Sequence, residues 1–180
     1  QADSAFDPSR GYHLSVEVTG SQRAAFSSTD ILHVEMLAKG LYTLADNHRF
    51  LARARVGGVG TNRFSDVPPS LRFFAGGDQS VRGYRYEALS PKDEDGIGIG
   101  GRFVLVGSME YQYQFAKAWR TAVFVDEGNA IDDPFDPLAT GVGVGIRWIS
   151  PLGPLRLDIA KGLDPRFGGE WRVHFSMGPE

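Results

Sequence analysis

Apolar and polar side chains alternate along most of this 180-residue chain, and this period of two constrains the fold more than any other feature. Successive side chains of a β-strand point to opposite faces, so each alternating run predicts a strand with one apolar and one polar face. About eight segments follow the pattern: residues 12–19, 31–36, 49–56, 101–115, 118–129, 142–148, 155–159 and 171–177. The chain is therefore predicted to be all-β, with antiparallel strands.

A soluble β-sandwich would show the same period, but three features favour a membrane barrel. The longer segments approach the roughly 9–11 residues that a tilted transmembrane strand needs. The polar faces carry several charges each, which is more than a packed sandwich core tolerates. The apolar faces carry aromatic residues near the strand ends, as an interfacial belt does: Tyr12, Phe103, Phe115, Trp119, Trp148 and Trp171. We therefore predict an antiparallel transmembrane β-barrel of about eight strands in contact with a lipid bilayer.

The composition argues against several other classes of protein. The formal net charge is only −3 and no basic run occurs, so we expect no nucleic-acid partner. The absence of cysteine excludes disulfides, thiolate metal sites and a cysteine nucleophile, and the four histidines have no ligand spacing. The chain starts at Gln1 without an initiator Met or a signal peptide, so we expect a mature or an engineered start.

Two short motifs resemble ligand-binding motifs, but in each case a structure without a ligand is the better explanation. Residues 96–101 match G-x-G-x-x-G, yet an alternating strand follows where a dinucleotide site needs a helix. The acidic segments 93–96 and 132–134 lack the ligand set of an EF-hand loop and are better explained as solvated loops. We therefore expect no catalytic residue, no metal and no cofactor, and no enzymatic activity.

The connections between predicted strands alternate in length. Residues 116–117 and 150–154 form short turns, whereas residues 62–98, 132–140 and 163–170 form longer polar segments. This asymmetry is typical of short periplasmic turns and long extracellular loops. The 62–98 connection is far longer than ordinary loops. Its apolar and aromatic side chains predict an ordered, buried loop: Leu71, Phe73, Phe74, Val81, Tyr84 and Tyr86.

Arg82, inside this long loop, has two candidate partners. Strand parity places Glu110 on the polar face of its strand, and Phe124 and Asp126 on the corresponding face of the next. A guanidinium can bridge two carboxylates with charge-assisted, often bidentate hydrogen bonds, and Gly83 permits a tight backbone beside it. The alternative is a surface arginine that contributes little. Spacing alone leaves both open.

Four motifs in order resemble those of the outer-membrane assembly-factor superfamily, which includes BamA, TamA and the two-partner secretion pores. Residues 73–77 with Val81-Arg82-Gly83-Tyr84 resemble the family's loop motif, and Gly100-Gly101 with residues 107–111 resemble its strand motif ending in Glu-Tyr. Residues 124–129 resemble its Phe-x-Asp-x-Gly motif, and residues 141–163 its penultimate hairpin. The amino-acid sequence of residues 72–84 and 178–180 is most similar to that of the TamA branch.

Members of this superfamily have periplasmic POTRA domains ahead of a sixteen-stranded barrel. The resemblance therefore implies that residues 1–180 are the C-terminal part of such a barrel, without POTRA domains, and that the loop of about residues 62–98 lies in the lumen. It also implies a set of loop-anchoring residues: Arg82, Gly83, Tyr84, Glu110, Phe124, Asp126 and Gly128.

The function implied by the resemblance is insertion and assembly of outer-membrane or autotransporter proteins in a Gram-negative outer membrane. A lateral seam between the first and last barrel strands would receive a substrate strand, and Trp171, Val173 and Phe175 would lie on one side of it. The implied partners are nascent β-barrel substrates and an inner-membrane-anchored protein of the TamB type. A secretion pore, an inert structural barrel and a soluble ligand-binding barrel are the alternatives.

One geometric conflict stays open in the sequence. A barrel of about eight strands is just filled by its own side chains, so closure would push the long loop outward. Gly143 and Gly145 would relieve only part of this crowding. The alternatives are self-association of two half-barrels, or a fragment designed to test barrel formation. The last strand also ends at Glu180, without the terminal aromatic residue common in outer-membrane barrels.

Overall fold

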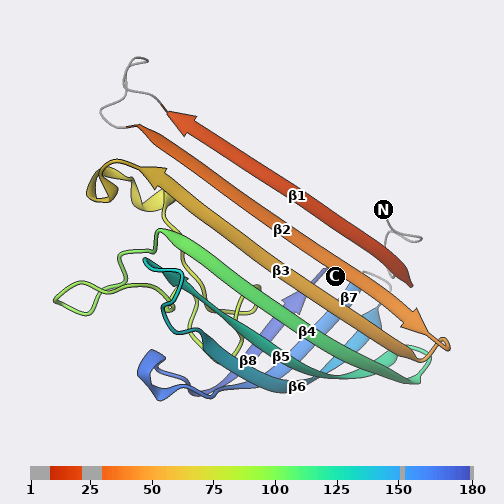
Figure 1. Ribbon diagram of the computed structural model, residues 1–180. Helices are drawn as coiled ribbons and strands as arrows, with labels where there is room; N and C mark the ends of the chain where they lie inside the picture. The colour runs from red at the N-terminus through yellow and green to blue at the C-terminus, as the bar shows by residue number, and fades with distance from the viewer. Residues whose placement is uncertain (1–8, 22–29, 151–152, 179–180) are drawn as a thin grey trace.

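The computed structural model describes residues 9–21, 30–150 and 153–178, which form one antiparallel sheet of eight strands (Figure 1). Each strand pairs with the next along the chain. The strands are β1 (Arg10–Ser21), β2 (Ile31–Leu44), β3 (His48–Thr61), β4 (Phe103–Ala116), β5 (Trp119–Ile131), β6 (Ala139–Ser150), β7 (Gly153–Gly162) and β8 (Trp171–Met177). The prediction of an all-β fold with about eight antiparallel strands is confirmed. Residues 151–152 of the predicted turn and 179–180 of the tail lie outside the described residues.

The sheet has an apolar outer face and an inner face that carries most of the polar side chains. On β5, Ala122, Phe124 and Asp126 are buried on the inner face, whereas Val123 and Val125 are 50% and 43% exposed on the outer face. The alternation follows from the pleat of the strand. A continuous exposed apolar face is what a transmembrane barrel presents to lipid.

The sheet is curved and has two separate edges. β1 and β8 lie at its ends and are not paired with each other in the described ranges. Figure 1 shows the sheet curving from β1 round to β8. Residues 11–13 of β1 and residues 176–178 line the same cavity. Because the described strands do not form a closed ring, the crowding expected from such a ring does not arise among them.

The connection between β3 and β4, residues 62–102, packs against the inner face of the sheet. It contains two single-turn 3-10 helices, η2 (Phe64–Asp66) and η3 (Pro69–Leu71), and a third, η4 (Pro165–Phe167), precedes β8. In the described part of the chain, no helix is both long and apolar enough to cross a membrane. The loop and the sheet share one hydrophobic core, formed by Val67, Phe73, Ala75, Val81, Tyr84 and Leu89 from the loop and by Ile31, Val59, Val104, Val106, Ala130 and Ala139 from β2 to β6.

Candidate functional site

The backbone beside Arg82 brings the loop into contact with the sheet. Gly83 has a φ of +91°, and a Cβ at this position would lie 2.3 Å from the backbone nitrogen of Gly162 on β7. Only glycine combines this left-handed conformation with such a close approach. The Arg82 backbone N–H donates to Asp126 Oδ2 at 3.1 Å. The backbone conformation at Gly83 therefore places Arg82 in contact with the inner face of the sheet.

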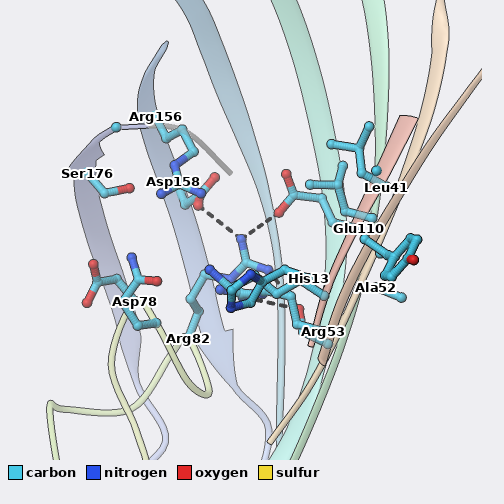
Figure 2. Close-up of a pocket in the computed structure, with 18 of the residues that line it drawn as sticks. His13, Leu41, Ala52, Arg53, Asp78, Arg82, Glu110, Arg156, Asp158 and Ser176 are labelled. Carbon is cyan, nitrogen blue, oxygen red and sulfur yellow. Dashed lines mark hydrogen bonds and ion pairs between the residues drawn. The ribbon is translucent and has the colours of Figure 1, made fainter. Parts of the chain in front are cut away.

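The Arg82 guanidinium binds three carboxylates on three strands. Nε and Nη2 donate to the two oxygens of Asp126 on β5, at 2.7 and 2.9 Å. Nη1 donates to Glu110 Oε2 on β4 at 2.8 Å and to Asp158 Oδ2 on β7 at 3.1 Å. Figure 2 shows Glu110 and Asp158 on opposite sides of the guanidinium. The planar fork of an arginine can satisfy all three partners, whereas a lysine ammonium would act only as a point charge.

A second arginine binds two of the same carboxylates. Arg147 on β6 donates through Nη2 to Glu110 Oε1 at 2.8 Å and through Nη1 to Asp158 Oδ1 at 2.5 Å. Its side chain is only 2% exposed. Buried charges are tolerated when each finds opposite charges and hydrogen bonds, as here. We call these five residues the inner network: Arg82, Arg147, Glu110, Asp126 and Asp158.

Glycines on the inner face of β6 provide the space that the inner network occupies. A Cβ at Gly141 would lie 1.9 Å from the Arg82 carbonyl oxygen, and a Cβ at Gly145 would lie 1.8 Å from Asp158 Oδ1. Gly143, between them, lies against the ring of a neighbouring phenylalanine in the same way. Any side chain at these positions would displace the network from the wall.

The charge of Arg82 is permanent at physiological pH. Burial by itself would lower the pKa of the guanidinium, but hydrogen bonds and charges from Asp126 and Glu110 outweigh burial and raise the pKa above its ordinary value. The guanidinium carbon also lies 3.3 Å from the centroid of the Phe124 ring, where a cation–π interaction adds to its binding.

Tyr84 fixes the loop on its other side. Its buried hydroxyl donates to the Thr140 carbonyl at 2.9 Å and accepts from the Asp164 N–H at 3.0 Å. Burial raises the pKa of Tyr84, so the hydroxyl keeps its proton and remains a donor at neutral pH. Gly128 has a different position: a Cβ there would lie 2.5 Å from the Leu105 carbonyl oxygen, so this glycine permits close contact between β5 and β4.

The structure thus brings Arg82, Glu110, Phe124 and Asp126 into direct contact, with Gly83 beside them. The three residues predicted for the seam lie elsewhere. Trp171, Val173 and Phe175 are 68%, 69% and 67% exposed on the outer face of β8. The predicted seam residues and the inner network are therefore two separate features of the molecule.

Sequence reasoning missed Arg147 and Asp158 as members of the network. Both lie on polar faces that the alternation identifies, but their convergence depends on how far neighbouring strands are staggered. One local signal was present. Asp158 pairs in register with Gly145, and a glycine opposite an inward carboxylate leaves that carboxylate room to bind a partner across the wall.

A cavity of about 400 Å³ lies beside the inner network (Figure 2). Its charged lining includes Arg53, Arg156, Asp78, Glu110 and Asp158. No group of three or more His, Asp or Glu side chains in the described ranges is arranged to hold a metal ion.

Comparison with known proteins decides the family. The model of the Omp85 superfamily domain matches residues 1–180. The chain belongs to the Omp85 superfamily. This confirms the resemblance at the level of the superfamily, while the TamA branch stays a prediction.

Relatives of this Omp85 chain include assembly factors and an organelle protein. BamA of Nitratidesulfovibrio vulgaris is 38% identical over 148 residues, covering 76% of this chain and 19% of the relative. Outer envelope protein 80 of Arabidopsis thaliana chloroplasts is 34% identical over 134 residues, covering 68% and 16%. BamA of Neisseria meningitidis is 27% identical, covering 99% and 27%. The chain thus spans between 16% and 27% of the length of these relatives.

Solved structures support the fold. BamA of Haemophilus ducreyi lacking POTRA domains 1–3 has a TM-score of 0.79 and 21% identity, covering 97% of this chain and 39% of that chain. CdiB of Acinetobacter baumannii has a TM-score of 0.61 and 17% identity, covering 91% and 30%. These two likenesses show the β-barrel fold of this Omp85 chain. The family match and the BamA relatives confirm the predicted location in the outer membrane of a Gram-negative bacterium.

Proposed function

We propose that this Omp85 segment is the C-terminal barrel part of a factor that inserts and assembles outer-membrane proteins, including autotransporters. Two of its relatives are named outer membrane protein assembly factors. The amino-acid sequence of the motif in residues 72–84 favours the TamA branch. The observation that carries the proposal is Arg82: its guanidinium, only 4% exposed, ties a long inward loop to three barrel strands.

The edge strand β8 supplies the second half of the proposal. β8 has 7 residues, whereas the other strands have 10 to 14. The edge of β8 that has no strand partner in the described ranges presents backbone groups to which a substrate strand can add by β-augmentation. Trp171, Val173 and Phe175 would keep the outer face of this seam in lipid. The anchored loop would hold the inner wall while the edge opens.

The partners in this proposal come from the exposed apolar face and from the family resemblance. The lipid bilayer contacts the outer face, and nascent outer-membrane or autotransporter β-barrels are the substrates. A TamB-type inner-membrane-anchored protein is the expected partner if the TamA branch is correct. Two copies could also associate through their edges, with β1 of one copy against β8 of the other.

Folding of an autotransporter barrel into phospholipid vesicles tests the proposal. Vesicles that contain the full chain should accelerate folding relative to empty vesicles, and Arg82→Ala should reduce the acceleration. An unaltered folding rate with the wild-type protein would refute assembly activity and leave a structural barrel.

Single-channel recording separates assembly from a two-partner secretion pore. The loop packs its buried side chains against the inner face, so we expect only small or brief currents. Large, steady currents in the wild-type protein would favour the secretion pore.

A further inference from the structure

The residue that follows Arg82 contacts the last strand directly. The Gly83 N–H donates to Nε2 of His174 on β8 at 3.2 Å. The Gly83 carbonyl oxygen accepts from the Glu170 N–H, just before β8, at 3.3 Å. Gly162 allows this approach, because a Cβ there would lie 2.8 Å from the same carbonyl oxygen. Both polar groups of Gly83 are therefore bound by the segment that forms the edge strand.

These contacts matter because β8 has few other attachments. It pairs with β7 over residues 171–177, and its other edge has no strand partner in the described part of the sheet. His174 lies on the inner face of β8, between two outward residues of the predicted seam. Its hydrogen bond to the loop thus adds a connection from β8 to the body of the barrel that does not pass through β7.

We propose that His174 is a positioning residue that couples the inward loop to the edge strand. The neutral imidazole accepts the Gly83 N–H and holds β8 in place. Loss of this acceptor frees β8 and leaves Arg82 bound in the inner network. The inference rests on the proposed function only where it treats β8 as the seam strand.

Protonation would remove the same acceptor. An imidazolium donates from both ring nitrogens, so it would point a donor at the Gly83 N–H. The charged groups around the ring are Asp78 of the loop and Asp158 of β7, which attract an imidazolium, and Arg82 and Arg172, which repel it. The coupling is therefore expected to weaken in acid while the carboxylate–arginine contacts of the inner network persist.

Hydrogen–deuterium exchange of the full chain in phospholipid nanodiscs tests the proposal, with peptides from β8 and from residues 76–84 followed separately. His174→Ala should accelerate exchange in β8 about fivefold, as expected for one lost hydrogen bond, and leave the loop protected. His174→Gln should restore protection, since its amide oxygen can accept the Gly83 N–H. Ser176→Ala is the matched control: Ser176 lies on the same face of β8, and its side chain forms no hydrogen bond within the described residues.

The pH profile distinguishes coupling from a general packing role. Between about pH 8 and about pH 4, exchange in wild-type β8, corrected for its intrinsic rate, should increase, and in His174→Gln it should stay constant. Wild-type protection of β8 in His174→Ala, or a flat wild-type profile, would overturn the proposal. If the alanine variant does not fold, the profile of the glutamine variant decides. No substrate is present, so a negative result leaves the assembly function to the vesicle assay.

Discussion

Replacing Arg82 with alanine is the sharpest test of the inner network. The change removes the guanidinium that binds Asp126, Glu110 and Asp158, whose side chains are 0%, 10% and 8% exposed. Arg147 still binds Glu110 and Asp158, whereas Asp126 loses the guanidinium that binds both of its oxygens. Removing one partner from a buried ion pair costs about 3–5 kcal/mol, because the remaining charge stays buried without compensation.

This cost applies to the docked loop, so it converts into a population of undocked loop. At about 1.4 kcal/mol for each factor of ten, the undocked population should rise roughly 10²- to 10⁴-fold. Limited proteolysis of residues 76–89 in vesicles measures it as a faster rate of cleavage. Arg82→Lys should give an intermediate rate, because an ammonium keeps the charge but cannot reproduce the bidentate contact with Asp126.

Two further variants control this experiment. Arg85→Ala removes an exposed arginine from the same loop whose side chain forms no hydrogen bond or ion pair in the described ranges, and its cleavage rate should match the wild type. Adding Asp126→Asn to Arg82→Ala should recover part of the protection, because it removes one uncompensated carboxylate. Cleavage of Arg82→Ala within twofold of the wild type would refute the reasoning that the network holds the loop.

Three other substitutions test neighbouring parts of the structure by guanidinium unfolding in vesicles. Gly145→Ala should destabilise the barrel strongly, since its Cβ would lie 1.8 Å from a network carboxylate, whereas Gly107→Ala, with nothing within 4 Å, should be near neutral; equal effects would contradict the space argument. Tyr84→Phe removes two hydrogen bonds and should lower the free energy of unfolding by about 1–3 kcal/mol. An unchanged free energy of unfolding would show that the hydroxyl does not stabilise the loop. Val144→Arg should cost about 2–4 kcal/mol if the outer face of β6 contacts the bilayer core, and no cost would place it in water.

The strands and their faces were predictable because they depend on local sequence. Alternation assigns Phe124 and Asp126 to one face of β5, and the structure places both on the inner face. A period of two fixes which side of a strand each residue occupies, whatever the neighbouring strands do. The same reasoning puts Trp171 and Val173 on the outer face of β8.

The meeting points between strands were not predictable in the same way. Asp158 binds both Arg82 and Arg147. These three side chains meet only because β6 and β7 are staggered against the loop and curve around it. Stagger and curvature depend on every strand pair in the sheet. Whether the β1 edge pairs with β8 or with another strand is also set by contacts far along the chain, which periodicity does not encode.

Strands β4 to β7 are held together by charged contacts on the inner face, whereas the last strand, β8, has fewer and weaker attachments. β4, β5 and β7 each give a carboxylate to Arg82, and β6 gives Arg147 together with the glycines that make room for the network. β8 is held by its short pairing with β7 and by the contacts of the Gly83 peptide, which include one neutral hydrogen bond to His174. Removing one partner from a buried charged pair of this kind costs several times as much as losing one neutral hydrogen bond. An edge strand can therefore detach at a cost that leaves the rest of the wall intact, which is the mechanical condition that a lateral seam requires.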